Sequence, residues 1–190
     1  MDPKRLEQNK WLNEVIYYTY IITPIGKLLL TAKHGKLIGL HIEGQKHFPT
    51  LHQNGEYNAD MPIFTDTKRQ LDTYFTLGKS LFTIDYKLYG TDFQINVWNV
   101  LAKIPYGEVL SYKRLTALTA YPNAIRAVAS AIGKNPLSII LPCHRVIRSD
   151  GSLGGYAGGI TVKKQLLNLE EDRGSVLKKI ILHSTKKTGL

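Results

Sequence analysis

The residue best suited to chemistry is Cys143, the only cysteine among the 190 residues. It follows Pro142, precedes His144 and Arg145, and lies between two apolar runs. A thiol becomes a strong nucleophile as the thiolate, and a neighbouring base or cation lowers its pKa. Because proline cannot donate to a strand ladder, Pro142 predicts that Cys143 lies on a turn at the end of a strand. The alternative is a buried cysteine that packs as a small apolar side chain, but the polar pair after it favours a reactive thiol.

A carboxylate near the end of the chain is a second candidate. Residues 161–171 show the apolar spacing of a helix, with Val162, Leu166 and Leu169 on one stripe. Glu170 lies four residues after Leu166, against that stripe. A carboxylate that faces a core usually has a partner, whereas a glutamate at the rim is exposed to water, and the spacing alone allows both.

Residues 149–159, between these two candidates, form a glycine-dense loop. Such a loop lets the backbone approach a ligand and present its amides. It matches neither the Walker nor the dinucleotide-binding fingerprint, so it does not indicate a phosphate cradle. A single cysteine excludes an internal disulfide and a zinc site built from several cysteines, and the other histidines are scattered, so we predict no metal site and no cofactor.

The positive charge of the chain is concentrated in its second half. Residues 1–102 carry 11 basic and 10 acidic side chains, and residues 103–190 carry 14 basic and 5 acidic ones, within a net charge of +10. A one-sided positive charge is typical of a protein that binds a polyanion, and nucleic acid is the first candidate. The alternative is a solvated basic face without a partner.

The composition is that of an ordinary soluble protein, with 43% hydrophobic and 21% charged residues. No apolar run reaches the length of a membrane span, and the first residues lack the apolar stretch of a signal peptide. We therefore expect a cytoplasmic protein without a membrane partner, and a bacterial or archaeal cytosol fits so short a chain.

The first half predicts a small antiparallel sheet with one helix. Segments 15–22, 27–32 and 36–42 are rich in β-branched and aromatic residues and are expected to be strands, the last two joined as a hairpin at His34-Gly35. Residues 44–62 show no period and are expected to be a loop. The spacing then predicts a helix from Thr65 to Leu77 that ends at Gly78, and a short strand near residues 82–86.

From Gly90 onward the pattern becomes helical. Thr91 and Gln94 have the spacing of a capping box, which opens a helix that residues 104–107 break. Two short helices follow, over residues 111–118 and 124–132, with Ser111 and Asn123 as the expected N-caps and Gly133 at the end. Two short helices around a turn resemble a helix-turn-helix.

The second of these helices carries one long polar side chain, Arg126, among alanines. A helix that reads the major groove normally offers several Arg, Asn or Gln side chains to the base edges. A helix this small can approach the narrow minor groove closely, with one arginine projecting. The alternative is that the alanines only pack against a neighbouring helix.

The residues around Cys143, Pro142-Cys143-His144-Arg145-Val146, resemble the acceptor-site signature of the O6-alkylguanine-DNA alkyltransferases (methylated-DNA–protein-cysteine methyltransferases). The first half resembles this family more weakly, chiefly through Thr23-Pro24-Ile25-Gly26. Across residues 90–171, further motifs follow in the family's order and spacing: Gly90-Thr91-x-Phe93-Gln94-x-x-Val97-Trp98, Ile104-Pro105-Tyr106-Gly107-Glu108, Ser111-Tyr112, Arg126-Ala127-Val128, Asn135-Pro136 and Gly155-Tyr156-Ala157-Gly158-Gly159.

The resemblance implies an α+β fold in two domains and a basic tail. The first domain, residues 1–88, would be a ribonuclease H-like small antiparallel sheet with a helix. The second, residues 89–175, would be a mostly helical, winged-helix-like helix-turn-helix domain that binds DNA and carries the acceptor. Residues 176–190 would be the tail.

The resemblance also implies a reaction, in which the protein takes the alkyl group of O6-alkylguanine onto Cys143. His144 would act as the base through a bridging water, and Glu170 would orient that histidine. Asn135 would support the turn that presents the thiol. Tyr112 would help to rotate the nucleotide out and then donate its hydroxyl to the guanine oxygen.

Further residues would hold the base and the DNA. The carbonyls of Cys143 and Val146 would accept the guanine amine, the amide of Ala157 would donate near the oxygen, and Tyr156 and Gly158 would complete the pocket. Arg126 would fill the vacated stack of a double-stranded DNA bound through its minor groove with little sequence preference. The remaining DNA contacts would come from Tyr112, Ala124, Ala127 and Ser149. The thioether on Cys143 has no good leaving group, so each molecule, expected to be a monomer, would act once.

Three other functions fit part of the sequence. A lesion sensor that binds the flipped base without accepting the alkyl group would not need Cys143. A helix-turn-helix regulator would bind one operator-like sequence. A cysteine hydrolase would turn over repeatedly on an ester or amide and would leave the basic half without a purpose.

Overall fold

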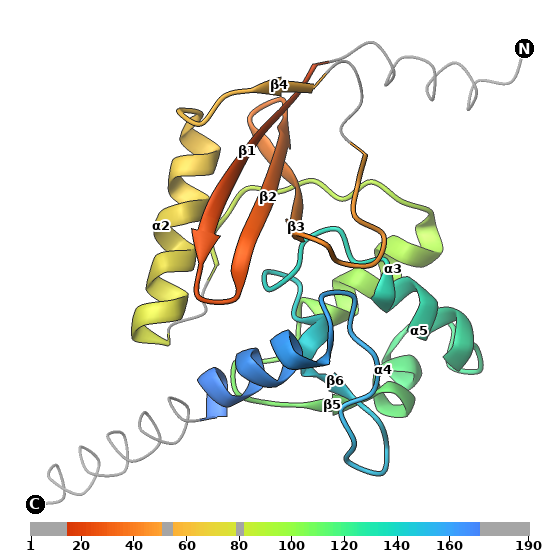
Figure 1. Ribbon diagram of the computed structural model, residues 1–190. Helices are drawn as coiled ribbons and strands as arrows, with labels where there is room; N and C mark the ends of the chain where they lie inside the picture. Colours follow the sequence, from red (N-terminus) through yellow and green to blue (C-terminus); the bar gives the residue numbers. More distant parts are fainter. Residues whose placement is uncertain (1–14, 51–54, 79–81, 172–190) are drawn as a thin grey trace, which may run out of the picture.

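The computed structural model describes residues 15–50, 55–78 and 82–171 of the chain, and the tail and the first residues lie outside this part. The first half forms a sheet in the order β3-β2-β1-β4 (Figure 1). The strands β1 (Ile16–Thr23), β2 (Gly26–Lys33) and β3 (Lys36–Ile42) pair antiparallel, as predicted. The strand β4 (Gly55–Tyr57) pairs parallel with β1 inside the segment predicted to be a loop. Three residues are too few to show an alternating pattern, so this strand could not be predicted from the sequence.

The helix α2 (Pro62–Leu77) runs along the sheet (Figure 1). It begins three residues before the predicted Thr65, because the fixed φ of proline suits the first helical position. It ends at Gly78 as predicted, where a φ of 64° lets the amide donate to the carbonyl of Tyr74. Its buried face includes Phe64, Leu71, Tyr74 and Phe75.

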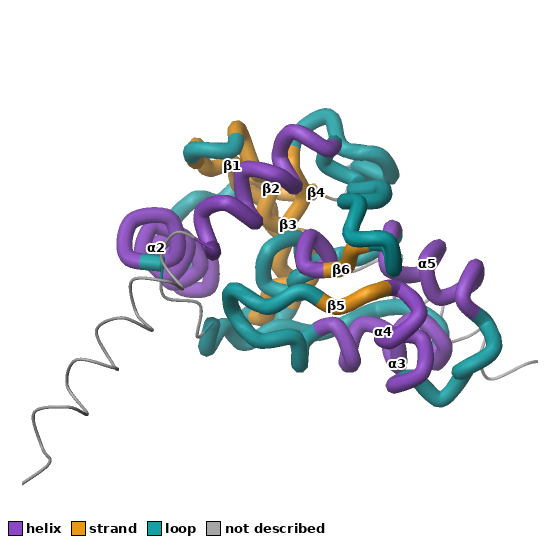
Figure 2. The backbone as a smooth tube through the Cα atoms, turned by 90° about the horizontal axis from the view of Figure 1, so that it is seen from below, coloured by secondary structure: helices purple, strands orange, loops and turns teal. Residues whose placement is uncertain are grey.

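The second half is mostly helical, with α3 (Asp92–Leu101), α4 (Tyr112–Leu118), α5 (Ile125–Gly133) and a helix over residues 160–171. Two short strands, β5 (Leu110–Ser111) and β6 (Val146–Ile147), pair in parallel. This pairing connects the residues before α4 with the residues that follow the turn at Cys143. Figure 2 shows α3, α4 and α5 gathered at the end of the molecule away from α2. Among the described residues no helix is both long enough and apolar enough to cross a membrane.

Local hydrogen bonds decide where these helices begin. The capping box of Thr91 and Gln94 is present, and Ser111 accepts from the amide of Arg114, as predicted. The predicted N-cap Asn123 is wrong. The N-cap of α5 is Ala124, without a side-chain bond, because a tight turn in which its amide donates to the carbonyl of Tyr121 moves the helix start.

The two halves meet along β3. The amide of Leu40 donates to the carbonyl of Pro136 at 2.8 Å, and the amide of Ser138 donates to the carbonyl of Leu40 at 2.9 Å. Leu37 pairs in the same way with Tyr86, so the strand predicted near residues 82–86 is a single bridge. Because these two short segments share one strand edge, neither extends into a strand. The buried side chains of both halves form one hydrophobic cluster, and the residues before Cys143 cross it as turns.

Candidate active site

The acceptor turn is a single turn of 3-10 helix, Cys143–Arg145, directly after Pro142. This confirms the turn predicted at Cys143, but the strand expected before it is wrong, because residues 138–141 form turns and a bend. The amide of Cys143 donates to the carbonyl of Leu141 at 2.7 Å, and the amide of Val146 donates to the carbonyl of Cys143. Asn135 donates through Nδ2 to Sγ of Cys143 at 3.1 Å and to the carbonyl of Leu141 at 2.7 Å. One amide group therefore fixes both the backbone of the turn and its sulfur.

Cys143 is 5% exposed and lies on the wall of a cavity of about 650 Å³. The cavity is large enough to hold a small organic ligand, because such sites span roughly 300–1,000 Å³. Its lining comes from α5, from the glycine-dense loop and from a loop of the first half. The lining residues are Lys46, His47, Tyr112, Ile125, Arg126, Ala129, Ser130, Ile132, Gly133, Cys143, Arg148, Gly155, Tyr156 and Ala157.

Glu170 is 1% exposed, which rules out the rim position that the sequence left open. Its Oε1 accepts from Tyr74 Oη at 2.7 Å, from His144 Nε2 at 2.8 Å and from Arg145 Nη2 at 3.0 Å. Its Oε2 accepts from Arg145 Nε at 2.8 Å and from the amide of Gly107 at 3.2 Å. Burial alone would raise the pKa of Glu170, but the hydrogen bonds and charges of His144 and Arg145 outweigh it and lower the pKa to about 2.

The ionised carboxylate fixes the tautomer of His144. A carboxylate only accepts, so Nε2 carries the proton, and Nδ1 of a neutral ring keeps its lone pair. Burial lowers the pKa of His144, although the hydrogen bond and charge of Glu170 act in the opposite direction, so the ring is neutral at pH 7. Nδ1 is buried and has no hydrogen-bond partner among the described residues. His144 is thus a neutral base whose proton-accepting atom is available.

The pKa of the Cys143 thiol is also shifted. Burial raises its pKa, against the hydrogen bond from Asn135, the charge of Lys163 and the amides of the turn. The resting sulfur is therefore protonated, and its neighbours are arranged to stabilise a thiolate once the proton leaves.

Lys163 is fully buried on the helix over residues 160–171. Its Nζ donates to the carbonyl of Val146 at 2.5 Å, to that of Gly155 at 3.4 Å and to that of Leu153. Burial lowers the pKa of Lys163 to about 8, and a negative charge on Cys143 acts in the opposite direction. One ammonium group therefore links β6 to the glycine-dense loop beside the thiol.

Tyr112 and Tyr156 contribute rings to the cavity. Burial raises the pKa of both hydroxyls, and a negative charge on Cys143 raises them further, so both stay protonated at neutral pH. Tyr112 donates weakly to the carbonyl of Gly155, at 3.4 Å. A donor so loosely held can turn to a ligand.

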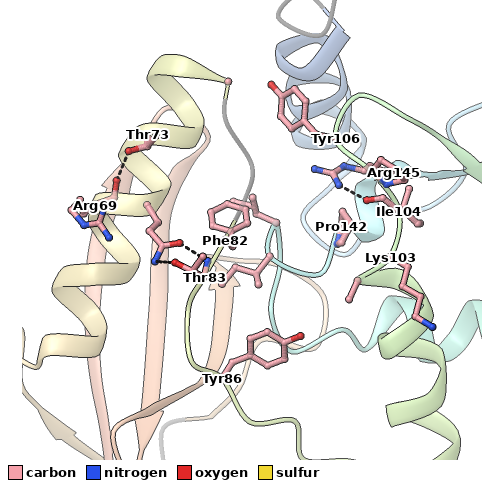
Figure 3. Close-up of a pocket in the computed structure, with 16 residues that line it drawn as sticks. Arg69, Thr73, Phe82, Thr83, Tyr86, Lys103, Ile104, Tyr106, Pro142 and Arg145 are labelled. Atoms are coloured by element: carbon pink, nitrogen blue, oxygen red, sulfur yellow. Dashed lines mark hydrogen bonds between the residues drawn. The ribbon is translucent and has the colours of Figure 1, made fainter. Parts of the chain in front are cut away.

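A second cavity, of about 690 Å³, shares no lining residue with the first, and Figure 3 shows the residues that line it. Arg145 and Pro142 form one wall, and α2 with Phe82 and Tyr86 forms the other. Arg145 is fixed there by a 2.7 Å bond to the carbonyl of Ile104. Cys143 lines the first cavity and does not line this one.

The chain matches known proteins in both halves. Residues 92–172 match the family model of the DNA binding domain of 6-O-methylguanine DNA methyltransferase, and residues 16–88 match that of its ribonuclease-like domain. A methylated-DNA–protein-cysteine methyltransferase of Methanosarcina barkeri is 40% identical over 157 residues, which are 83% of this chain and 98% of the relative. This chain belongs to the O6-methylguanine-DNA methyltransferase family.

Other members of the family match over similar lengths. The methylated-DNA–protein-cysteine methyltransferase of Mycobacterium tuberculosis is 41% identical over 159 residues, which are 84% of this chain and 94% of the relative. A crystal structure of M. tuberculosis OGT in complex with DNA is similar with a TM-score of 0.77, at 40% identity over 83% of this chain and 94% of that chain. The predicted resemblance to this methyltransferase family and the predicted α+β fold are confirmed.

The structure brings many of the predicted site residues together. Cys143, Tyr112, Arg126, Tyr156 and Ala157 line one cavity. Asn135 donates to the thiol, His144 donates to Glu170, and all three residues are buried. Val146 is fully buried, and its carbonyl already accepts from Lys163. The cavity lining does not include Gly158, Ser149, Ala124 or Ala127.

Sequence reasoning missed four members of this methyltransferase site: Tyr74, Arg145 as a partner of Glu170, Lys163 and the loop with Lys46. Lys163 could have been found, because it lies three residues before Leu166 and seven before Glu170, on the same helix face. Tyr74 falls at the helical spacing of the apolar residues of α2, and that spacing does not show what its hydroxyl contacts. No pattern marked the loop. Among the described residues no group of three His, Cys, Asp or Glu side chains could hold a metal ion.

Proposed function

We propose that this protein repairs DNA by transferring the alkyl group of O6-alkylguanine to its own Cys143. The observation that carries this proposal is the position of the thiol. It lies on the wall of a base-sized cavity, bonded to Asn135, next in the chain to a neutral histidine that Glu170 anchors. Family membership makes the alkyl transfer the expected reaction.

The transfer starts with the thiol proton. Nδ1 of His144 accepts it through a bridging water, and Glu170 stabilises the imidazolium that forms. The thiolate attacks the alkyl carbon, a carbon–sulfur bond forms, and the bond from that carbon to O6 breaks. The electron pair stays on the guanine, and the protonated hydroxyl of Tyr112 donates to the departing oxygen.

The cavity holds the guanine by its edges. The carbonyls of Cys143 and Val146 accept from its exocyclic amine, with the second lone pair of each, since the first is used by Val146 N and Lys163. The amide of Ala157 donates near O6, and the ring of Tyr156 forms a wall. Gly158 supports that wall, because a Cβ there would come within 3.0 Å of the Tyr156 ring and 2.6 Å of Ile42.

The base reaches the cavity by leaving the duplex. We place α5 in the minor groove, where its exposed residues Arg126, Ala127 and Ser130 leave room for close approach. Arg126 fills the vacated stack, and Tyr112, Ala124 and Ser149 complete the contact. Such contacts depend on phosphate and shape, so we expect little sequence preference. The position of α5 is fixed by a 2.9 Å bond from Trp98 Nε1 to the carbonyl of Ala131.

The product is a thioether on Cys143, which has no good leaving group, so a monomer acts once. The test is to incubate the protein with duplex DNA that contains O6-methylguanine and to weigh the peptide that contains residue 143. We expect a gain of one methyl group on Cys143, which saturates at one per protein, and no gain in Cys143→Ala. Repeated turnover, or DNA that stays methylated at an unchanged peptide mass, would overturn the proposal.

A further inference from the structure

The first half of the chain contributes a wall to the cavity that holds Cys143. Lys46 and His47 belong to the loop after β3, and they line the cavity together with Arg126 and Tyr156. In Figure 1 this loop turns from β3 towards the second half. The N-terminal domain is therefore part of the surface that an incoming base must pass.

This loop is held in place from both halves. The amide of Lys46 donates to the carbonyl of Ala157 at 2.9 Å, which ties it to the glycine-dense loop. Gln45 is buried, and its Oε1 accepts from the amide of Ile42 at 2.8 Å and from Ser138 Oγ at 3.4 Å. The loop is thus anchored to the segment that leads into the acceptor turn as well as to the opposite cavity wall.

The backbone of His47 has a φ of 61°, which residues with a Cβ rarely adopt. Such a conformation persists where the surroundings over-determine it. Here the anchors at Gln45 and Lys46 do so, and the side chains of Lys46 and His47 are both exposed at the cavity.

The charges at this cavity have one sign. Lys46, Arg126 and Arg148 line it and are exposed, and the lining contains no aspartate or glutamate. No ion-pair partner of Lys46 occurs within the described ranges of the chain. The three cations come from three separate segments, and a nucleotide that enters between them carries a phosphate on each side.

We propose that Lys46 binds a backbone phosphate next to the extruded nucleotide, so that DNA is bound from both halves of the molecule. This inference rests on the proposed function. Arg126 holds the duplex from α5, and Lys46 holds the displaced strand from the opposite side of the cavity. The DNA-binding surface of the protein then extends beyond the helix-turn-helix.

The experiment measures equilibrium binding to duplex DNA with one O6-methylguanine, in a Cys143→Ser background that cannot react. Lys46→Gln is compared with Lys27→Gln, since Lys27 is a partly exposed lysine of β2 whose partner is Glu43 at 3.0 Å. We expect Lys46→Gln to weaken binding about 3–10-fold at low salt and to reduce the slope of log K against log salt by about 0.9, the value for one phosphate. Lys27→Gln should leave both unchanged.

Two further measurements separate a phosphate contact from a disturbed fold. In the Cys143-containing protein, Lys46→Gln should slow the reaction with duplex DNA more than the reaction with free O6-benzylguanine, because that base carries no phosphate. His47→Gly relieves the left-handed φ, so it should fold at least as stably while a looser loop weakens DNA binding.

An unchanged salt slope in Lys46→Gln would overturn the inference, and so would an equal loss with free base. The proposed function fails separately: it falls if the wild-type protein does not demethylate the duplex, whatever Lys46 does.

Discussion

Tyr74 of α2 donates a 2.7 Å hydrogen bond to Oε1 of Glu170, the carboxylate oxygen that also accepts from His144. The two residues lie in different halves of the chain, 96 positions apart. A side chain of the first half therefore contacts the carboxylate that anchors His144 of the second half. The ribonuclease-like half is connected to the surroundings of Cys143 by this bond as well as by the cavity wall.

Tyr74→Phe removes this hydroxyl and little else. The bond goes to a buried charge, so we expect a loss of about 1.5–3 kcal/mol in the free energy of unfolding, measured with urea. One donor fewer on Oε1 makes the carboxylate a better acceptor for His144, so the pKa of His144 should rise, measured by NMR of its ring.

The matched control is Tyr106→Phe, because the hydroxyl of Tyr106 donates to the carbonyl of Leu169 at 3.4 Å. It should leave the pKa of His144 where it is. Equal shifts in the two variants would mean that Tyr74 acts only through packing.

Glu170→Gln removes the only carboxylate that contacts Arg145 among the described residues. A buried ion pair that loses one partner leaves an uncompensated charge, so we expect the free energy of unfolding, measured with urea, to fall by roughly 3–5 kcal/mol. The control is Asp72→Asn. The Lys68–Asp72 pair on α2 is about half exposed, so its loss should lower the free energy of unfolding by less than about 1 kcal/mol.

The same variant has a signature in pH. The pKa of Glu170 is lowered from 4.5 to about 2, so its contribution to stability is complete above pH 4.5 and is lost as pH falls towards 2. Unfolding by urea at several pH values should show this decline in the wild type, and the part due to residue 170 should vanish in Glu170→Gln. A decline that is as steep in the variant would assign it to other carboxyl groups.

The sequence predicts best what local geometry determines. The capping box of Thr91 and Gln94 and the cap at Ser111 depend on residues three positions apart, so the pattern contains all the information. Pro142 likewise predicts the turn at Cys143, because proline has no backbone N–H and therefore interrupts a strand at its own position. The order of the three long strands follows from short hairpin turns.

Contacts between residues far apart in the sequence cannot be predicted from local patterns. A helical stripe predicts that Tyr74 is buried but not what its hydroxyl reaches, since Glu170 approaches only when both halves pack together. The same holds for Lys46, whose place at the cavity depends on a bond to Ala157. The strand predicted near Tyr86 failed for a related reason, because β3 has one free edge and Leu137 takes part of it.

Asn135→Ala tests the support of the sulfur. It removes the donor to Sγ, so the pKa of the Cys143 thiol should rise, and its reaction with free O6-benzylguanine should slow most at low pH and recover as pH increases. The measurement is the single-turnover rate as a function of pH. Asn96→Ala is the control, because Asn96 caps the amide of Ala120 at 3.0 Å away from the thiol. A rate that falls by the same factor at every pH would show that Asn135 shapes the turn without affecting the charge.

Lys163→Met tests the buried ammonium. The folded protein has a pKa of about 8 at Lys163 and the unfolded chain has 10.5, so between these values the unfolded chain binds more protons. The stability of the wild type should therefore rise with pH through this window, and the rise should be smaller in Lys163→Met.

The substitution also leaves the carbonyls of Val146, Leu153 and Gly155 without this donor, so amide hydrogen exchange of the glycine-dense loop should become faster. The control is Lys164→Met, the exposed neighbour on the same helix, which should change neither. If the exchange of residues 153–155 stays slow in Lys163→Met, the loop is held by its own backbone and the ammonium serves the thiolate alone.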